Sequence, residues 1–83
     1  KSLSYPYSNF LIVEKGRKDG ENAFIYIEND KLTGYGYFDL NYQINNKSQI
    51  KNRLISVSEN YDTKKLIYTY LYQKKFLKLI HLQ

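Results

Sequence analysis

The sequence contains no cysteine, no methionine and no tryptophan, and it has a single proline among 83 residues. The absence of cysteine excludes disulfide bridges, thiolate-bound zinc and a cysteine nucleophile, and it fits a reducing compartment, so we expect a cytoplasmic protein. Apolar runs are far shorter than the roughly 18 residues of a membrane-spanning helix, so no membrane partner is expected. The segment from Lys1 to Pro6 lacks the apolar stretch of a secretory signal. Because the chain starts at Lys1 and has no methionine, we expect a processed chain or an excised fragment.

Positive charge is concentrated in the second half of the chain. Residues 1–46 carry five basic and six acidic groups, whereas residues 47–83 carry eight basic and two acidic groups, a net charge of +6. Clustered Lys and Arg supply the sequence-independent part of nucleic-acid binding, so DNA is the expected partner. The alternative is a merely solvated surface, because abundant Lys, Tyr, Asn and Ile are also typical of an AT-rich genome. The candidate nucleic-acid contacts are Lys47, Lys51, Arg53, Lys64, Lys65, Lys74, Lys75 and Lys78.

A chain of this length forms one domain, residues 1–83, with a thin core and an N-terminal tail over residues 1–9. Strands are predicted over residues 10–15, 23–28 and 32–40. The first has large apolar residues on both faces, which is typical of a central strand. The two connections are polar and contain Gly, Asn and Asp, which favours hairpins and therefore a three-stranded antiparallel meander.

Helical spacing replaces the strand pattern after residue 46, and it predicts one helix over residues 47–56 and a second that Asp62 can cap at its N-terminus. A last strand is predicted over residues 76–82. A right-handed crossover would place this fourth strand parallel to the first, with both helices on one face and the sheet order 3-2-1-4. This α+β layout is the first half of a ribonuclease H-like fold. The core-facing stripe of the second helix is expected to be Leu66, Ile67, Tyr70 and Leu71.

The third predicted strand has two different faces. Alternation places Leu32, Gly34, Gly36 and Phe38 together, and the two glycines form a trough that lets a helix or another backbone approach closely. Tyr35 and Tyr37 lie on the opposite face. Together with Tyr26 they can form an aromatic platform, although tyrosines of this kind are also ordinary strand formers.

A self-sufficient catalytic site is not predicted. Two-metal phosphoryl chemistry needs several carboxylates, and the first strand offers only Glu14, while residues 76–83 contain no acid. Glu14 is interpreted first as a strand-end residue that reaches solvent or Arg17. A residual metal-dependent nuclease that uses Glu14 with Asp39, or with acids from a partner chain, is the alternative. His81 has no serine or metal-ligand partner, so no catalytic residue, metal ligand or cofactor is assigned.

Several short stretches carry a family resemblance: Phe10–Arg17, Ile25–Asn29, Gly34–Phe38 and the Asp62-Thr63 pair. They resemble the C-terminal region of exonuclease-domain proteins, common in Bacteroidetes, in which a DNA polymerase III epsilon-like exonuclease is fused to a UvrC-like GIY-YIG module. The resemblance implies that the catalytic modules lie upstream and that this chain is a C-terminal piece. It also implies a degenerate ribonuclease H-like half-domain, in which Glu14 takes the place of the first catalytic aspartate and the second acid has no counterpart.

The expected function is therefore a non-catalytic accessory domain of a DNA repair or replication nuclease. It would contact the DNA backbone or dock on the upstream nuclease domains. The alternative is a protein-interaction or dimerisation module without nucleic-acid contact, which would use the tyrosine face or an unpaired sheet edge.

Overall fold

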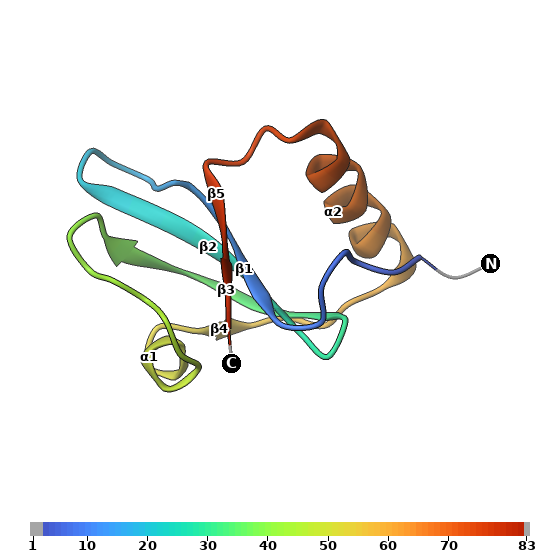
Figure 1. Ribbon diagram of the computed structural model, residues 1–83, viewed down its shortest axis with the longest axis horizontal. Coiled ribbons are helices and arrows are strands. Elements are labelled where there is room, and N and C mark those ends of the chain that lie inside the picture. Colours follow the sequence, from blue (N-terminus) through green and yellow to red (C-terminus); the bar gives the residue numbers. More distant parts are fainter. Residues whose placement is uncertain (1–2, 83) are drawn as a thin grey trace.

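The computed structural model describes residues 3–82, which form one antiparallel sheet of five strands and two helices (Figure 1). The strand order across the sheet is β4-β3-β2-β1-β5. The elements in chain order are β1 (Phe10–Lys15), β2 (Glu21–Glu28), β3 (Lys31–Asp39), α1 (Ser48–Lys51), β4 (Ile55–Ser56), α2 (Tyr61–Gln73) and β5 (Lys78–His81).

The last strand overturns the predicted topology. β5 lies beside β1 but runs antiparallel to it, with Phe10 opposite His81 and Val13 opposite Lys78, and β4 adds a strand at the other edge. The predicted order 3-2-1-4, its parallel fourth strand and the ribonuclease H-like arrangement are therefore wrong. The cause is the path of the chain: it leaves β4 at one edge, crosses the sheet through α2 and reaches the end of β1, where the Leu77 N–H donates to the Val13 carbonyl (2.9 Å). From that end it can only return antiparallel.

The two helices lie on opposite faces of the sheet, so the prediction of both on one face is also wrong (Figure 1). Alternate residues of β1 account for this, because side chains along a strand point to opposite sides. Leu11 and Val13 pack in one cluster with Ile50 of α1, whereas Phe10 and Ile12 pack in another with Ile67 of α2. These four β1 side chains are fully buried, which confirms that the first strand is central and covered on both sides.

The turn between β2 and β3 follows its sequence prediction. Asn29 and Asp30 adopt left-handed φ angles of 52° and 62°, which Asn and Asp tolerate better than most side chains. A register shift between Tyr26 and Ile27 then places Leu32 opposite Ile27. Leu32 consequently joins the α2-side cluster, and the prediction that it shares a face with Gly34 and Gly36 is wrong.

The glycine trough of β3 is filled by backbone. A Cβ on Gly36 would lie 2.5 Å from the Arg53 carbonyl oxygen, and one on Gly34 would lie 2.6 Å from that of Ile55. The expected close approach is thus confirmed. It also explains why the predicted helix over residues 47–56 is too long: α1 ends at Lys51, and Ile55 and Ser56 are extended to pair with β3 as β4.

α2 begins two residues earlier than predicted, because its N-cap is Asn60 and not Asp62. The Asn60 side chain accepts a hydrogen bond from the Thr63 N–H (2.8 Å), as an N-cap does. Ile67 and Leu71 face the core as expected, but Leu66 is 72% exposed. Residues 3–9, expected as a tail, pack on the sheet through the buried ring of Tyr5. Between residues 3 and 82 no helix has the length and apolar character needed to cross a membrane.

Candidate functional site

The eight predicted nucleic-acid contacts do not form one surface, because the helices lie on opposite faces. Three of them already have partners. Lys47 pairs with Glu28 (3.4 Å), Arg53 stacks on the Tyr42 ring (4.0 Å), and Lys64 lies 3.5 Å from Asp30 and 4.0 Å from Glu59. Lys51 and Lys78 are exposed on the α1 side of the sheet. Lys78 has the same parity in β5 as Ile80 and lines a pocket with Ile44 and Ile80, whereas Leu79 packs on the α2 side.

The remaining three lie on α2 and just after its C-terminal end, and all are exposed. Within residues 3–82 none of them forms an ion pair. No Asp or Glu follows Asp62 in the sequence, so no acid from the same segment neutralises them. This unpaired set, called here the lysine group, consists of Lys65, Lys74 and Lys75.

A row of tyrosines accompanies the lysine group along α2. Tyr61, Tyr68 and Tyr72 are spaced by seven and four residues, which places them on one side of the helix, and Lys65 falls between them. All three are exposed, and Tyr72 is 82% exposed. The seven- and four-residue spacing of these tyrosines is present in the sequence. From the sequence we predicted only the buried stripe through Leu66 and Ile67, so the tyrosine row was missed.

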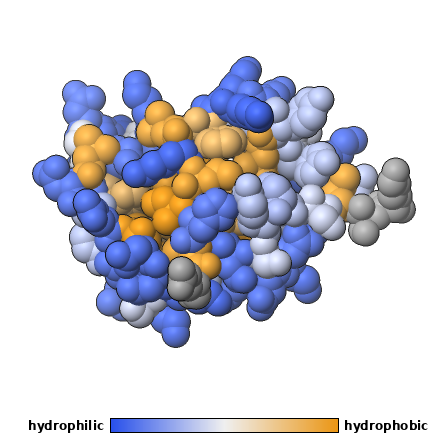
Figure 2. Space-filling view, in the orientation of Figure 1, coloured by the Kyte–Doolittle hydropathy of each residue, from blue (hydrophilic) through white to orange (hydrophobic). Residues whose placement is uncertain are grey.

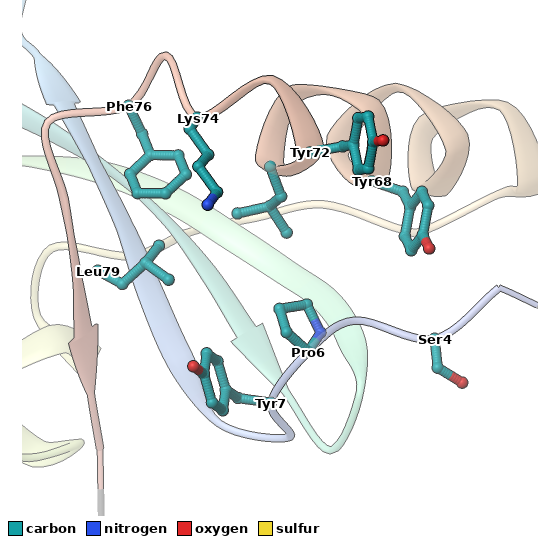
Figure 3. Close-up of a pocket in the computed structure, with 9 residues that line it drawn as sticks. Ser4, Pro6, Tyr7, Tyr68, Tyr72, Lys74, Phe76 and Leu79 are labelled. Atoms are coloured by element: carbon teal, nitrogen blue, oxygen red, sulfur yellow. The ribbon is translucent and has the colours of Figure 1, made fainter.

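An open apolar groove of about 350 Å³ lies between α2, β5 and the N-terminal segment (Figure 3). Pro6 and Tyr7 form one side and Tyr68 and Tyr72 the other, while Phe76 and Leu79 close the end near β5. The Lys74 side chain extends from the end of α2 into this space. These seven residues define the α2 groove. Figure 2 shows that hydrophobic residues gather across the middle of this face of the molecule, with hydrophilic residues around them.

The Tyr7 ring is held in place from two sides. Its edge-to-face contacts are with His81 (ring centroids 4.4 Å apart) and with Phe10 (5.8 Å). His81 therefore has a packing partner in Tyr7.

The predicted tyrosine platform of β3 is smaller than expected. Tyr35 and Tyr37 pack edge to face (6.2 Å), and the Arg17 guanidinium lies 3.7 Å from the Tyr37 ring. Tyr26 is not part of it, because it is buried on the α1 side of the sheet. Its hydroxyl has no hydrogen-bond partner among the described residues. Burial, together with the neighbouring Glu28 carboxylate, raises the pKa of Tyr26 to about 12.

Glu14 does not reach Arg17, contrary to one interpretation of the sequence. Arg17 instead forms an ion pair with Glu21 (2.8 Å), and its backbone N–H and guanidinium donate hydrogen bonds to the Glu21 carboxylate. These hydrogen bonds lower the pKa of the Glu21 carboxyl to about 2. One carboxylate oxygen of Glu14 is buried without a hydrogen-bond partner in the described chain.

The strand register separates Glu14 from Asp39, the acid proposed as its metal-binding companion. Asp39 lies opposite Glu21 in the β2–β3 register, and β3 is two strands away from β1. The Asp39 carboxylate accepts a hydrogen bond from the Asn41 N–H (2.9 Å). Across residues 3–82 no three His, Asp, Glu or Cys side chains lie close enough to hold a metal ion together. The geometry therefore gives no support to a nuclease site built on Glu14.

Comparisons with protein-family models, with curated proteins and with solved structures find no match. The resemblance to exonuclease proteins is accordingly still a prediction, and the candidate site is defined by its geometry alone.

Proposed function

We propose that this domain is a non-catalytic nucleic-acid-binding module that serves as an accessory domain of a DNA-processing nuclease in the cytoplasm. The observation that carries the proposal is the lysine group on the α2 side of the molecule. Three exposed ammonium groups, without acidic partners within residues 3–82, lie on a surface that also displays Tyr68 and Tyr72. Such a combination suits phosphate and base contacts. The sequence resemblance to nuclease C-terminal regions supports the parent activity.

Electrostatics favours this side of the domain over the α1 side. Lys47 on the α1 side is paired with a carboxylate, so phosphate would have to displace Glu28 to reach it. Within residues 3–82 no carboxylate forms an ion pair with the lysine group, so phosphate would displace none there. Each phosphate neutralised on single-stranded DNA releases counterions and contributes about 0.7 to the slope of log K against log salt concentration.

Fluorescence anisotropy of labelled DNA across a salt series tests the proposal. Replacement of all three members of the lysine group by alanine should weaken binding and lower the salt slope by about 2, on the order of 0.7 for each lost contact. A matched control removes the same charge elsewhere through Lys15→Ala, Lys18→Ala and Lys51→Ala, all exposed positions. Equal losses in both variants, or no DNA binding at low salt, would contradict the proposal.

A second candidate function, a protein-interaction or dimerisation module, is favoured by the edge of the sheet. β5 is an edge strand of the sheet. Two leucines near it are exposed: Leu66 on α2 and Leu77 directly before β5. Lys78 lies in this edge strand, where a lysine discourages pairing between two copies, so docking on a neighbouring domain fits better than dimerisation. Sedimentation velocity over a hundredfold concentration range discriminates: a homodimer module would sediment faster at high concentration, whereas the nucleic-acid module would sediment as a monomer throughout.

A further inference from the structure

The α2 groove has the chemistry of a site for a planar aromatic ring that carries a negative charge. Its sides are tyrosine, phenylalanine, proline and leucine side chains, and Lys74 is the cation that reaches into it (Figure 3). Aromatic side chains stack on nucleobases whatever the base, and lysines contact the phosphates between them. We infer that the α2 groove receives an unstacked base of single-stranded nucleic acid while the lysine group holds the adjoining phosphates. This inference rests on the proposed function and deepens it.

The size of the groove selects single strands. Its volume of about 350 Å³ is at the small end of the range for small-molecule sites, roughly 300 to 1,000 Å³, so it accommodates one ring system with part of its sugar. Bases in a duplex are stacked on their neighbours and cannot enter such a groove. Single strands present their bases free of that constraint. The domain should therefore prefer single-stranded over double-stranded DNA.

The aromatic walls are exposed and partly fixed before any ligand binds. Tyr72 and Tyr68 lie one helical turn apart, so both rings border the same length of groove. Across from them, the edge contacts with His81 and Phe10 restrict Tyr7. A ring that is already positioned loses less conformational entropy on binding, which favours affinity.

Lys74 occupies a backbone position that favours glycine. Its φ of 57° is left-handed, at the C-cap of α2, where its N–H donates to the Leu71 carbonyl (3.1 Å). Glycine would adopt this conformation with less strain but would leave the groove without a cation. Lys75, which directly follows Lys74 and is exposed, adds a second positive charge at this end of α2. Charge complementarity thus favours a polyanion with aromatic bases over an uncharged aromatic ligand.

The test compares three labelled oligonucleotides of one sequence, as single-stranded DNA, duplex DNA and single-stranded RNA, on the full chain. The Tyr68→Ala, Tyr72→Ala double variant should lose about tenfold or more in affinity for the single strands, because base stacking on an aromatic ring contributes roughly 1 to 3 kcal/mol per base. Duplex affinity and the salt slope should not change. Tyr61→Ala, on the same helix but outside the α2 groove, is the matched control and should change affinity less than twofold. Loss of affinity for either single-stranded polymer supports the inference, and the stronger binder identifies the polymer.

Intrinsic tyrosine fluorescence gives an independent readout, since the chain has ten tyrosines and no tryptophan to obscure them. Oligonucleotide stacking should quench this fluorescence, and the double variant should lose part of the quenching. If single strands and duplex bind equally and the tyrosine variants bind like the wild type, the inference is overturned while the proposed function stands. If no polynucleotide binds at low salt, both are overturned.

Discussion

The hydroxyl of Tyr5 donates a hydrogen bond of 2.9 Å to the carboxylate of Glu59, a residue 54 positions further along the chain. The same carboxylate oxygen accepts from the Leu32 N–H (2.8 Å), and the Tyr5 N–H donates to Asp30 (2.8 Å). Lys64 lies beside both acids. This group fixes the N-terminal segment to the β2–β3 turn and to the loop that leads into α2.

Tyr5→Phe should lower the free energy of unfolding by about 1 to 2 kcal/mol. The change removes a buried hydrogen bond to a charged acceptor and adds no new group. Urea denaturation measures the effect. Tyr7→Phe is the control, because its exposed side chain has no described hydrogen bond, and it should change stability by less than about 0.5 kcal/mol. Equal effects of the two changes would show that the Tyr5–Glu59 bond contributes nothing.

Tyr26→Phe should have the opposite sign and stabilise the protein by about 1 kcal/mol. The Tyr26 hydroxyl is buried without a hydrogen-bond partner among the described residues, so its removal ends a desolvation penalty. Thermal and urea unfolding at pH 7 give the difference. A loss of stability would indicate that the hydroxyl has a partner, such as the neighbouring Glu28 carboxylate or an ordered water molecule.

The same tyrosine predicts a pH dependence in alkali. Its pKa is about 12 in the folded state against an ordinary value of 10.0, so the protonated form is favoured by folding. This contribution is complete below pH 10 and is lost as the pH rises from 10 to 12, at up to about 1.4 kcal/mol per pH unit. Tyr26→Phe should therefore flatten the decline of wild-type stability in that window. Parallel curves for the two proteins would contradict the assignment.

We expect the stability contributed by the Glu21 carboxylate to depend on pH in acid. Its hydrogen bonds from Arg17 lower the pKa of its carboxyl from 4.5 to about 2, so its contribution to stability is present above pH 4.5 and is lost as the pH falls towards 2. An NMR titration of the Glu21 carboxyl measures this pKa directly. Arg17→Gln should return it towards 4.5, and an unchanged value would show that another group causes the shift.

Gly36 and Gly20 should respond differently to the same replacement. Alanine at Gly36 places a Cβ 2.5 Å from the Arg53 carbonyl oxygen and should destabilise the domain by roughly 1 to 3 kcal/mol or more. Alanine at Gly20 meets no atom within 4 Å and is opposed only by a φ of +83°. Asparagine, which tolerates positive φ, should restore most of the stability at Gly20 and none at Gly36. Urea denaturation of the four variants tests this distinction between crowding and backbone strain.

The sequence predicted most of what depends on local pattern. The buried β1, the Asn29-Asp30 turn and the close approach at Gly36 follow from alternation, φ preference and side-chain size, which neighbouring residues decide. The direction of β5 does not, because it depends on where a long connection returns to the sheet. The prediction that Leu66 faces the core is wrong for a similar reason. The contact between α2 and the sheet is narrow, and Ile67 and Leu71 are the α2 side chains that are buried in it.

The candidate site was predicted only in part. Its lysines could be named from the charge distribution, but not their separation from Lys47, Lys51 and Arg53, since this follows from the helices lying on opposite faces. The α2 groove was invisible in the sequence because Tyr7 and Tyr72 are brought together only by the docking of residues 3–9.

The two sides of the α2 groove come from the beginning and the end of the described chain, and the hydrogen bonds around Tyr5 and Asp30, together with the ring contacts of Tyr7, hold the first side in position. Occupancy of the groove and attachment of the N-terminal segment are therefore thermodynamically linked. Whatever binds between Tyr7 and Tyr72 must slow hydrogen exchange at the Tyr5 amide, and whatever loosens that amide must weaken binding by the same factor.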